Sequence, residues 1–108
     1  KDISKAREYY VKSIKLSNEV NGYVSLASTY LRYEDNPQEA KKIIEKGLRS
    51  YPNYQRLQLY LAVCEYKLGN KDEAIKIAER EYQRVPSPES QYVLTQISNN
   101  QEVIISDN

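Results

Sequence analysis

The sequence contains no histidine and a single cysteine, Cys64. Without histidine the chain lacks the commonest general base near neutral pH and the commonest zinc ligand. One thiol excludes a disulfide within the chain and disfavours a cysteine-based metal site. Because Cys64 falls on an apolar helical stripe, we interpret it as a small core residue rather than as a nucleophile.

Phosphate-binding and nucleophile motifs are missing as well. Gly22, Gly47 and Gly69 are isolated, so the sequence has no glycine-rich phosphate loop, and it has no nucleophile elbow. Acidic residues stand mostly beside basic ones, which favours solvated surface charge over a carboxylate pair that performs acid–base chemistry. We therefore predict a chain that is not an enzyme and that has no cofactor and no metal site.

Long apolar runs and an excess of one charge are also lacking. No run approaches the ~20 apolar residues of a membrane helix, and there is no signal peptide, so we expect no membrane insertion. The 16 basic and 15 acidic residues nearly cancel, which predicts no binding to nucleic acid. The single thiol slightly favours a cytoplasmic location without excluding a secreted one.

Phenylalanine, tryptophan and methionine are absent, whereas the chain has 11 tyrosines. Tyrosine therefore supplies all the aromatic packing, and each buried ring needs a partner for its hydroxyl. Tyrosines and arginines gather at residues 49–56, a combination that suits single-stranded nucleic acid. Because the overall charge is balanced, we favour the alternative that Tyr51 and Tyr54 join consecutive helices.

The sequence does contain an internal repeat of 34 residues. Residues 36–40 recur as residues 70–74, and Pro52 recurs as Pro86. A period of this length is typical of stacked units that are each too small to bury their own apolar face. The same frame extends upstream to Asp2, Ala6 and Asn18.

Apolar periodicity and helix-terminal residues predict six helices. Asn36 is placed to cap the third helix, with Pro37 in its first turn and Glu39 in position to reach back to the cap. Gly69 is placed to end the fourth helix, and Ser87 to cap the sixth. We expect the helices at about residues 2–17, 22–33, 37–51, 54–68, 70–84 and 87–98.

Two sets of positions connect this pattern with a known family. The second helix places an aromatic, a leucine, a small residue and another aromatic at helical spacing: Tyr23, Leu26, Ala27 and Tyr30. The third carries an acidic–small pair, a bulky residue, a small residue and a final proline: Glu39, Ala40, Ile44, Gly47 and Pro52. With these features the chain resembles the tetratricopeptide repeat family over about residues 2–98.

This resemblance implies an all-α fold, a right-handed α-α superhelix of about six antiparallel helices. It implies a half repeat at residues 1–20, full repeats at 21–53 and 54–86, a closing helix at 87–98 and a tail at 99–108. One departure concerns the fifth helix, where Ala78 replaces a bulky residue and Glu81 a small one. We expect Ile75 and Tyr82 to fill the space that Ala78 leaves.

In the family that the chain resembles, the first helices of successive repeats line a concave groove that holds a peptide. Amide side chains in such a groove can pair with a partner's backbone, and an arginine can bind a carboxylate. The alternative is that these positions are ordinary exposed helix residues. The candidates for binding a partner are Asn21, Val24, Ser28, Leu31, Arg32, Gln55, Gln58, Glu65 and Tyr66.

The two ends of the array raise separate expectations. The chain starts in the middle of a repeat and without methionine, so we expect an excised piece of a longer protein, with Ile3, Tyr9, Tyr10 and Ile14 partly exposed on an uncapped first helix. The last helix is expected to present a polar outer side through Glu89, Ser90, Gln91, Gln96 and Ser98. Residues 101–108 are expected to be mobile, although the apolar Val103-Ile104-Ile105 leaves docking on a neighbour open.

The sequence thus predicts a protein–protein interaction scaffold that presents a concave groove to a peptide or a partner protein. Two alternatives remain open at this point. The chain is a regulatory or substrate-docking segment of a larger enzyme, or it is a self-assembly module that forms a homo-oligomer through the uncapped N-terminal helix.

Overall fold

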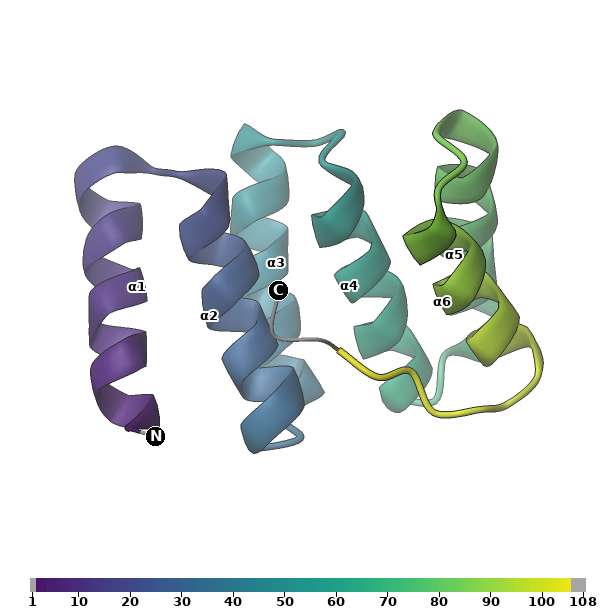
Figure 1. Cartoon of the computed structure of the whole chain (residues 1–108), viewed down its shortest axis with the longest axis horizontal. Coiled ribbons are helices and arrows are strands. Elements are labelled where there is room, and N and C mark those ends of the chain that lie inside the picture. Colours follow the sequence, from purple (N-terminus) through teal and green to yellow (C-terminus); the bar gives the residue numbers. More distant parts are fainter. Residues whose placement is uncertain (1, 106–108) are drawn as a thin grey trace.

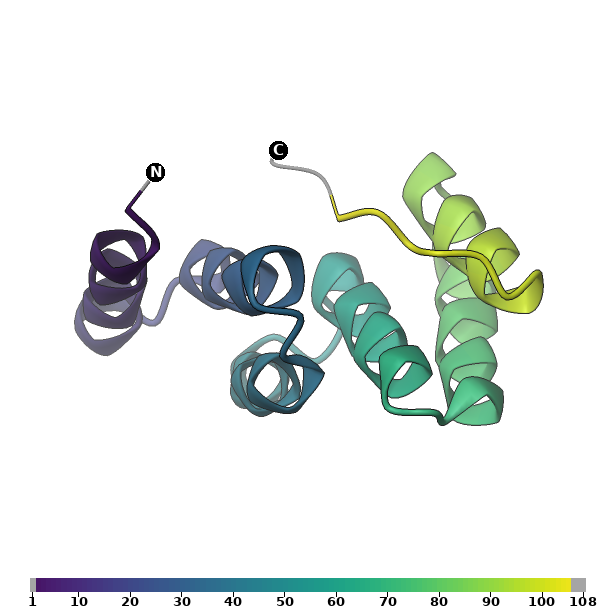
Figure 2. The ribbon, with the colours of Figure 1, turned by 90° about the horizontal axis from the view of Figure 1, so that it is seen from below.

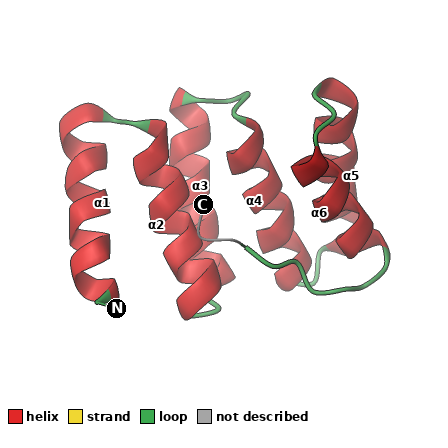
Figure 3. Cartoon of the chain, in the orientation of Figure 1, coloured by secondary structure: helices red, strands yellow, loops and turns green. Residues whose placement is uncertain are grey.

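The computed structural model describes residues 2–105, except for the side chain of Ser17. Within these residues the chain forms six α-helices and no strand (Figures 1 and 3). The prediction of an all-α fold with six helices is confirmed. The helices are α1 (Ile3–Ser17), α2 (Val20–Tyr33), α3 (Pro37–Ser50), α4 (Gln55–Lys67), α5 (Lys71–Arg84) and α6 (Pro88–Ser98).

Several helix ends lie at residues whose chemistry favours them. The Asp2 side chain accepts a hydrogen bond from the Lys5 amide at 3.1 Å and begins α1. Gly69 adopts a φ of 91°, a left-handed conformation that glycine tolerates, directly after α4. Ser87 and Ser90 form a reciprocal capping box at the start of α6. These local signals explain why the sequence located the helices well.

Two details at helix starts differ from the expectation. Glu39 does not reach back to the cap of α3, because the Asn36 amide already donates to the Tyr30 carbonyl at 2.9 Å. The Glu39 carboxylate instead accepts from Lys42 at 3.3 Å. Helix α2 starts at Val20, earlier than predicted, and its N-cap Glu19 makes no side-chain capping bond that the sequence pattern could have indicated.

The helices form two layers. Each helix packs against the next, and α2 also packs against α4 and α4 against α6. Seen from below, α3 and α5 lie on one side of this α2–α4–α6 row, and the chain segment that follows α6 lies on the other side (Figure 2). We call the side that carries this segment the α2–α4–α6 face.

The core lies between the two layers and tolerates little extra volume at Gly47. A Cβ added there would lie 2.9 Å from Tyr23 Cγ and 3.0 Å from Leu57 Cδ1, closer than atoms pack in proteins. Gly47 occupies the position at which the sequence pattern required a small residue. It lets α3 approach α2 and α4. The side chains of Leu57 and Cys64 on α4 are completely buried.

Helix α5 accommodates its unusual residues through an ion pair. Glu81 is 2% exposed, and its carboxylate lies 2.5 Å from the guanidinium of Arg84. Arg84 also donates to the Asn53 carbonyl at 2.8 Å, which joins the end of α5 to the α3–α4 turn. Ile75 packs against the core as expected, and Tyr82 is half-buried. The ion pair therefore gives a partner to the buried Glu81 carboxylate, which stands where the family pattern has a small residue.

On the first helix the expected partial exposure of Ile3, Tyr9, Tyr10 and Ile14 is confirmed, whereas the last helix differs from its expected surface. Tyr9 is 68% exposed, whereas Ile14 packs against the core and Leu16 is the most exposed apolar side chain of α1 at 86%. On α6, Ser90 is fully buried because it belongs to the capping box rather than to a polar outer side.

Candidate functional site: the α2–α4–α6 face

The chain segment after α6 lies across the α2–α4–α6 face in an extended form (Figure 2). We call residues 101–105 the docked segment. Its central residue, Val103, is 6% exposed and belongs to the hydrophobic core. The expectation of a mobile tail is therefore wrong for residues 101–105, because they bury apolar side chains on the chain's own helices. Residues 106–108 of the predicted tail lie outside the described residues.

A tight turn at the end of α6 directs the chain onto this face. The Asn99 amide donates to the Thr95 carbonyl at 3.0 Å, and the Gln101 amide donates to the Gln96 carbonyl at 2.8 Å. Asn100 between them has a φ of 56°, a left-handed conformation that asparagine tolerates better than most residues. The turn is therefore held by the backbone bonds that satisfy the last carbonyls of the helix.

Three side chains of the face bind the main chain of the docked segment. The Tyr66 hydroxyl donates to the Gln101 carbonyl at 3.1 Å, and the Gln96 amide donates to the Glu102 carbonyl at 2.7 Å. The Ile104 amide in turn donates to the Tyr92 hydroxyl at 3.0 Å. Because every peptide has these backbone groups, this part of the contact does not depend on the side chains of the bound segment.

Two hollows border the docked segment. One, of ≈ 180 Å³, lies between α2 and α4 and is lined by Leu31, Arg32, Lys67 and residues 102–105. The other, of ≈ 330 Å³, lies between α4 and α6 and is lined by Leu59, Tyr60, Pro88, Glu89, Tyr92, Val93 and residues 103–105. Aliphatic side chains and tyrosine rings make up most of the second wall, so it suits apolar groups. Burial raises the pKa of Tyr60 and keeps this ring neutral.

Three of the residues that the sequence assigned to a groove lie beside the docked segment. Leu31 and Arg32 line the smaller hollow, and Tyr66 binds the segment directly. Leu31 is 5% exposed, and the guanidinium of Arg32 lies 4.7 Å from the ring centre of Tyr33. Of the other candidates on α2, Val24 is buried in the core, Ser28 is half-buried and Asn21 is exposed.

The two glutamines of α4 join helices within the fold. The Gln55 amide donates to the Val85 carbonyl at 2.7 Å, and its oxygen accepts from the Ser87 hydroxyl at 2.7 Å. Gln58 donates to the Pro52 carbonyl at 3.0 Å and accepts from Arg80 at 3.4 Å. These contacts position the α5–α6 turn and α5 against α4, so both side chains already have partners within the chain.

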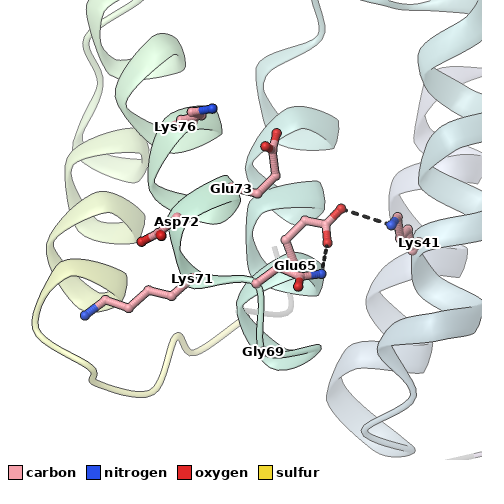
Figure 4. A pocket seen from close by; sticks show the side chains of 8 residues that line it. Lys41, Glu65, Gly69, Lys71, Asp72, Glu73 and Lys76 are labelled. Carbon is pink, nitrogen blue, oxygen red and sulfur yellow. Dashed lines mark hydrogen bonds and ion pairs between the residues drawn. The ribbon is translucent and has the colours of Figure 1, made fainter.

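Glu65 lies in a different hollow from the docked segment. This hollow, of ≈ 600 Å³, is lined by Lys41, Glu65, Gly69, Asn70, Lys71, Asp72, Glu73 and Lys76, and none of these residues lines either hollow beside the docked segment. Figure 4 shows Lys41 of α3 directed at Glu65, whereas Lys71 and Asp72 point away from it. The structure therefore places Glu65 at the junction of α3, α4 and α5, apart from the docked segment.

The contacts of Glu65 indicate a structural role. The Lys41 ammonium lies 3.0 Å from one carboxylate oxygen, and the Asn70 amide donates to the other at 2.9 Å. Burial by itself raises the pKa of Glu65, but the hydrogen bonds from Asn70 and Lys41 outweigh it and lower the pKa below its ordinary value. With its carboxylate already bound at both oxygens, Glu65 connects three helices.

Sequence reasoning missed several residues of the face. The sequence pattern does not assign Tyr92 to partner binding and assigns Gln96 only to a polar outer side, yet both bind the docked segment. Lys67 was not considered, and it borders the smaller hollow while pairing with Asp35 at 3.0 Å. The one available signal was the apolar run of residues 103–105 within a polar end of the chain.

The described residues contain no metal-binding cluster, and their thiol is buried. No group of three or more His, Cys, Asp or Glu side chains in residues 2–105 is arranged to hold a metal ion. Cys64 is fully buried, and burial raises the pKa of its thiol to about 12, so the thiolate is not populated near neutral pH. None of the helices described here has both the length and the apolar character needed to cross a membrane.

These features define a class, an all-helical array of stacked helix pairs with a peptide-sized face. A family model of the tetratricopeptide repeat matches residues 31–97, more than half of the chain. The chain therefore belongs to the tetratricopeptide repeat family, whose helices form a repeat superhelix and act as a general protein–protein interaction module. A search of curated proteins and a search of solved structures found no match.

Proposed function

We propose that the α2–α4–α6 face binds an extended peptide of a partner protein, and that the chain acts as a scaffold without catalytic activity. The observation that carries this proposal is the set of three hydrogen bonds that Tyr66, Gln96 and Tyr92 make with the main chain of an extended segment, the first two as donors and Tyr92 as acceptor. A surface that can satisfy the backbone groups of one extended segment offers the same bonds to another.

The position of the face in the array also supports its assignment as the surface that binds a peptide. It is formed by the helices that begin successive repeats, α2, α4 and α6, while α3 and α5 lie behind them. Leu31, Arg32 and Tyr66, which the sequence assigned to partner binding, border it. The role of all nine predicted groove residues in binding a partner stays a prediction, as does the absence of nucleic-acid binding.

Selection of peptides from a random displayed library, followed by amide chemical-shift mapping on the labelled chain, tests this proposal. We expect the largest chemical-shift changes on α2, α4 and α6. We also expect Arg32→Ala to weaken the binding of the selected peptides. Arg80→Ala, which removes an arginine from α5, is the matched control and should leave affinity unchanged. Peptides that map instead to the hollow around Glu65, or that respond to the Arg80 variant alone, would contradict the proposal.

A further inference from the structure

We propose that the α2–α4–α6 face selects an extended peptide that carries aliphatic side chains two residues apart, and that the docked segment closes this site as a tethered copy of such a ligand. This inference rests on the proposed function, because it names the chemistry of the peptide that the face takes. It follows from how residues 103–105 differ in exposure.

The three apolar residues of the docked segment alternate between the face and the solvent. Val103 is 6% exposed, Ile104 is 69% exposed, and Ile105 is partly buried against the core. This period of two is the pattern of an extended chain, in which side chains i and i+2 point to the same side. The face therefore accepts two side chains of the segment and leaves the one between them in solvent.

The walls that receive Val103 and Ile105 are apolar. The core cluster that includes Val103 also contains Leu31, Leu59, Tyr60 and Val93, which come from α2, α4 and α6. Burying an aliphatic side chain against such a surface contributes more to binding than any one of the exposed backbone bonds contributes. Selectivity among peptides therefore comes from the two inward side chains, while the backbone bonds fix the extended conformation.

The larger hollow shows that the docked segment fills the site incompletely. A space of ≈ 330 Å³ remains between α4, α6 and residues 103–105. A partner that carries bulkier aliphatic side chains than Val103 at the inward positions would fill more of this space. A partner can therefore exceed the docked segment in contact energy and displace it, although the segment has the advantage of its covalent connection.

That advantage is considerable, because only Asn99 and Asn100 separate the docked segment from α6. A short connection gives a tethered ligand an effective concentration on the order of millimolar. A peptide that competes from solution binds the fraction of molecules in which the segment has left, and its apparent affinity falls by that fraction. The wild-type chain should therefore bind only those peptides whose intrinsic affinity for the face is high enough to displace the docked segment.

The test compares two full-length variants. One changes the side chains of the segment that point to the face, and the other changes the side chain that points to solvent. Val103→Asp/Ile105→Asp places charges at the inward positions, whereas Ile104→Asp places one in solvent. The probe is a fluorescently labelled peptide with the sequence of residues 99–105, followed by anisotropy. We expect the inward variant to bind this peptide about tenfold or more tightly than the wild-type chain, and the Ile104 variant to resemble the wild type.

Equal affinity in the two variants would overturn the inference, and so would a probe with aspartate at both inward positions that binds as well as the original. A wild-type dimer that dissociates when the probe is added would place the segment on a second copy instead and overturn the tethered arrangement. If the double aspartate variant does not fold, Val103→Ser and Ile104→Ser make the same comparison. Failure here while library peptides still map to the face would leave the proposed function intact.

Discussion

The hydroxyl of Tyr66 donates a hydrogen bond to the main-chain carbonyl of Gln101, 35 residues further along the chain, at 3.1 Å. This bond links the end of α4 to the segment that follows α6. It places a side chain that the sequence assigned to partner binding on the backbone of an extended peptide. The relationship between these two residues connects the fold to the proposed function.

Removing the two hydroxyls that bind the docked segment should loosen it without disturbing the helices. We expect Tyr66→Phe and Tyr92→Phe each to lower the free energy of unfolding by about 0.5–1.5 kcal/mol, the usual net contribution of a hydrogen bond. Amide hydrogen exchange at Ile104, whose N–H donates to Tyr92, should become faster in Tyr92→Phe. Tyr82→Phe on α5 is the control. Exchange at Ile104 that is as slow in Tyr92→Phe as in this control would refute the contact.

The helices were predictable from sequence because their signals are local. Asn36, Gly69 and Ser87 act on residues within four positions of themselves, and the apolar stripes repeat along one helix. Where no such signal exists, as at Glu19, the predicted start of α2 lies two residues after the observed one. The period of 34 residues then supplied the stacking order, since each unit must cover the next.

The site was predictable only in part, because its contacts are not local. Glu65 has the spacing of a groove residue, but Lys41, on another helix, draws it to the α3–α4–α5 junction, and a single sequence carries no mark of that pair. The docked segment is held through its backbone by Tyr66, Gln96 and Tyr92, and backbone contacts leave no residue pattern. The apolar composition around Val103 indicates that this residue is buried, but it does not indicate which helices cover it.

Replacing Lys41 should weaken the chain in a pH-dependent way. Lys41→Met leaves the buried Glu65 carboxylate without its cation, and we expect a loss of about 1–3 kcal/mol at pH 7. Because the folded-state pKa of Glu65 is lowered, its stabilising contribution is present above its ordinary value of 4.5 and is lost as the pH falls through the lowered value.

Urea unfolding at pH 7 and pH 3 measures this effect. The drop in unfolding free energy between the two pH values should be smaller in Lys41→Met than in Lys42→Met, which removes the exposed neighbouring lysine paired with Glu39. The same drop in both variants would mean that Lys41 does not lower the pKa of Glu65.

A side chain at Gly47 should disturb the packing of α3 against α2 and α4. The added methyl group of Gly47→Ala would lie 2.9 Å from Tyr23 Cγ and 3.0 Å from Leu57 Cδ1. Overpacking of this kind typically costs about 1–3 kcal/mol. Thermal and urea unfolding should show this loss, while Lys46→Ala at the exposed neighbouring position should stay within about 0.5 kcal/mol of the wild type. An unchanged stability in Gly47→Ala would show that the helices can separate without cost.

The exposed side of α1 should govern any self-association. Leu16 is 86% exposed and Tyr9 68% exposed, and Arg7 fixes the helix to α2 through an ion pair with Glu34 at 2.6 Å. We expect weak association of the wild-type chain at high concentration, reduced in Tyr9→Lys/Leu16→Lys. Sedimentation equilibrium measures it, with Lys12→Glu as a control that changes charge without removing an apolar group. A wild-type chain that stays monomeric throughout would exclude the self-assembly alternative.

The most direct test of the central claim is a set of methyl nuclear Overhauser effects on the isotopically labelled full-length chain. If the docked segment occupies the α2–α4–α6 face, the methyl groups of Val103 and Ile105 should show contacts to the ring protons of Tyr60 or Tyr92. Random-coil shifts for both residues, with no contacts to the helices, would contradict the account.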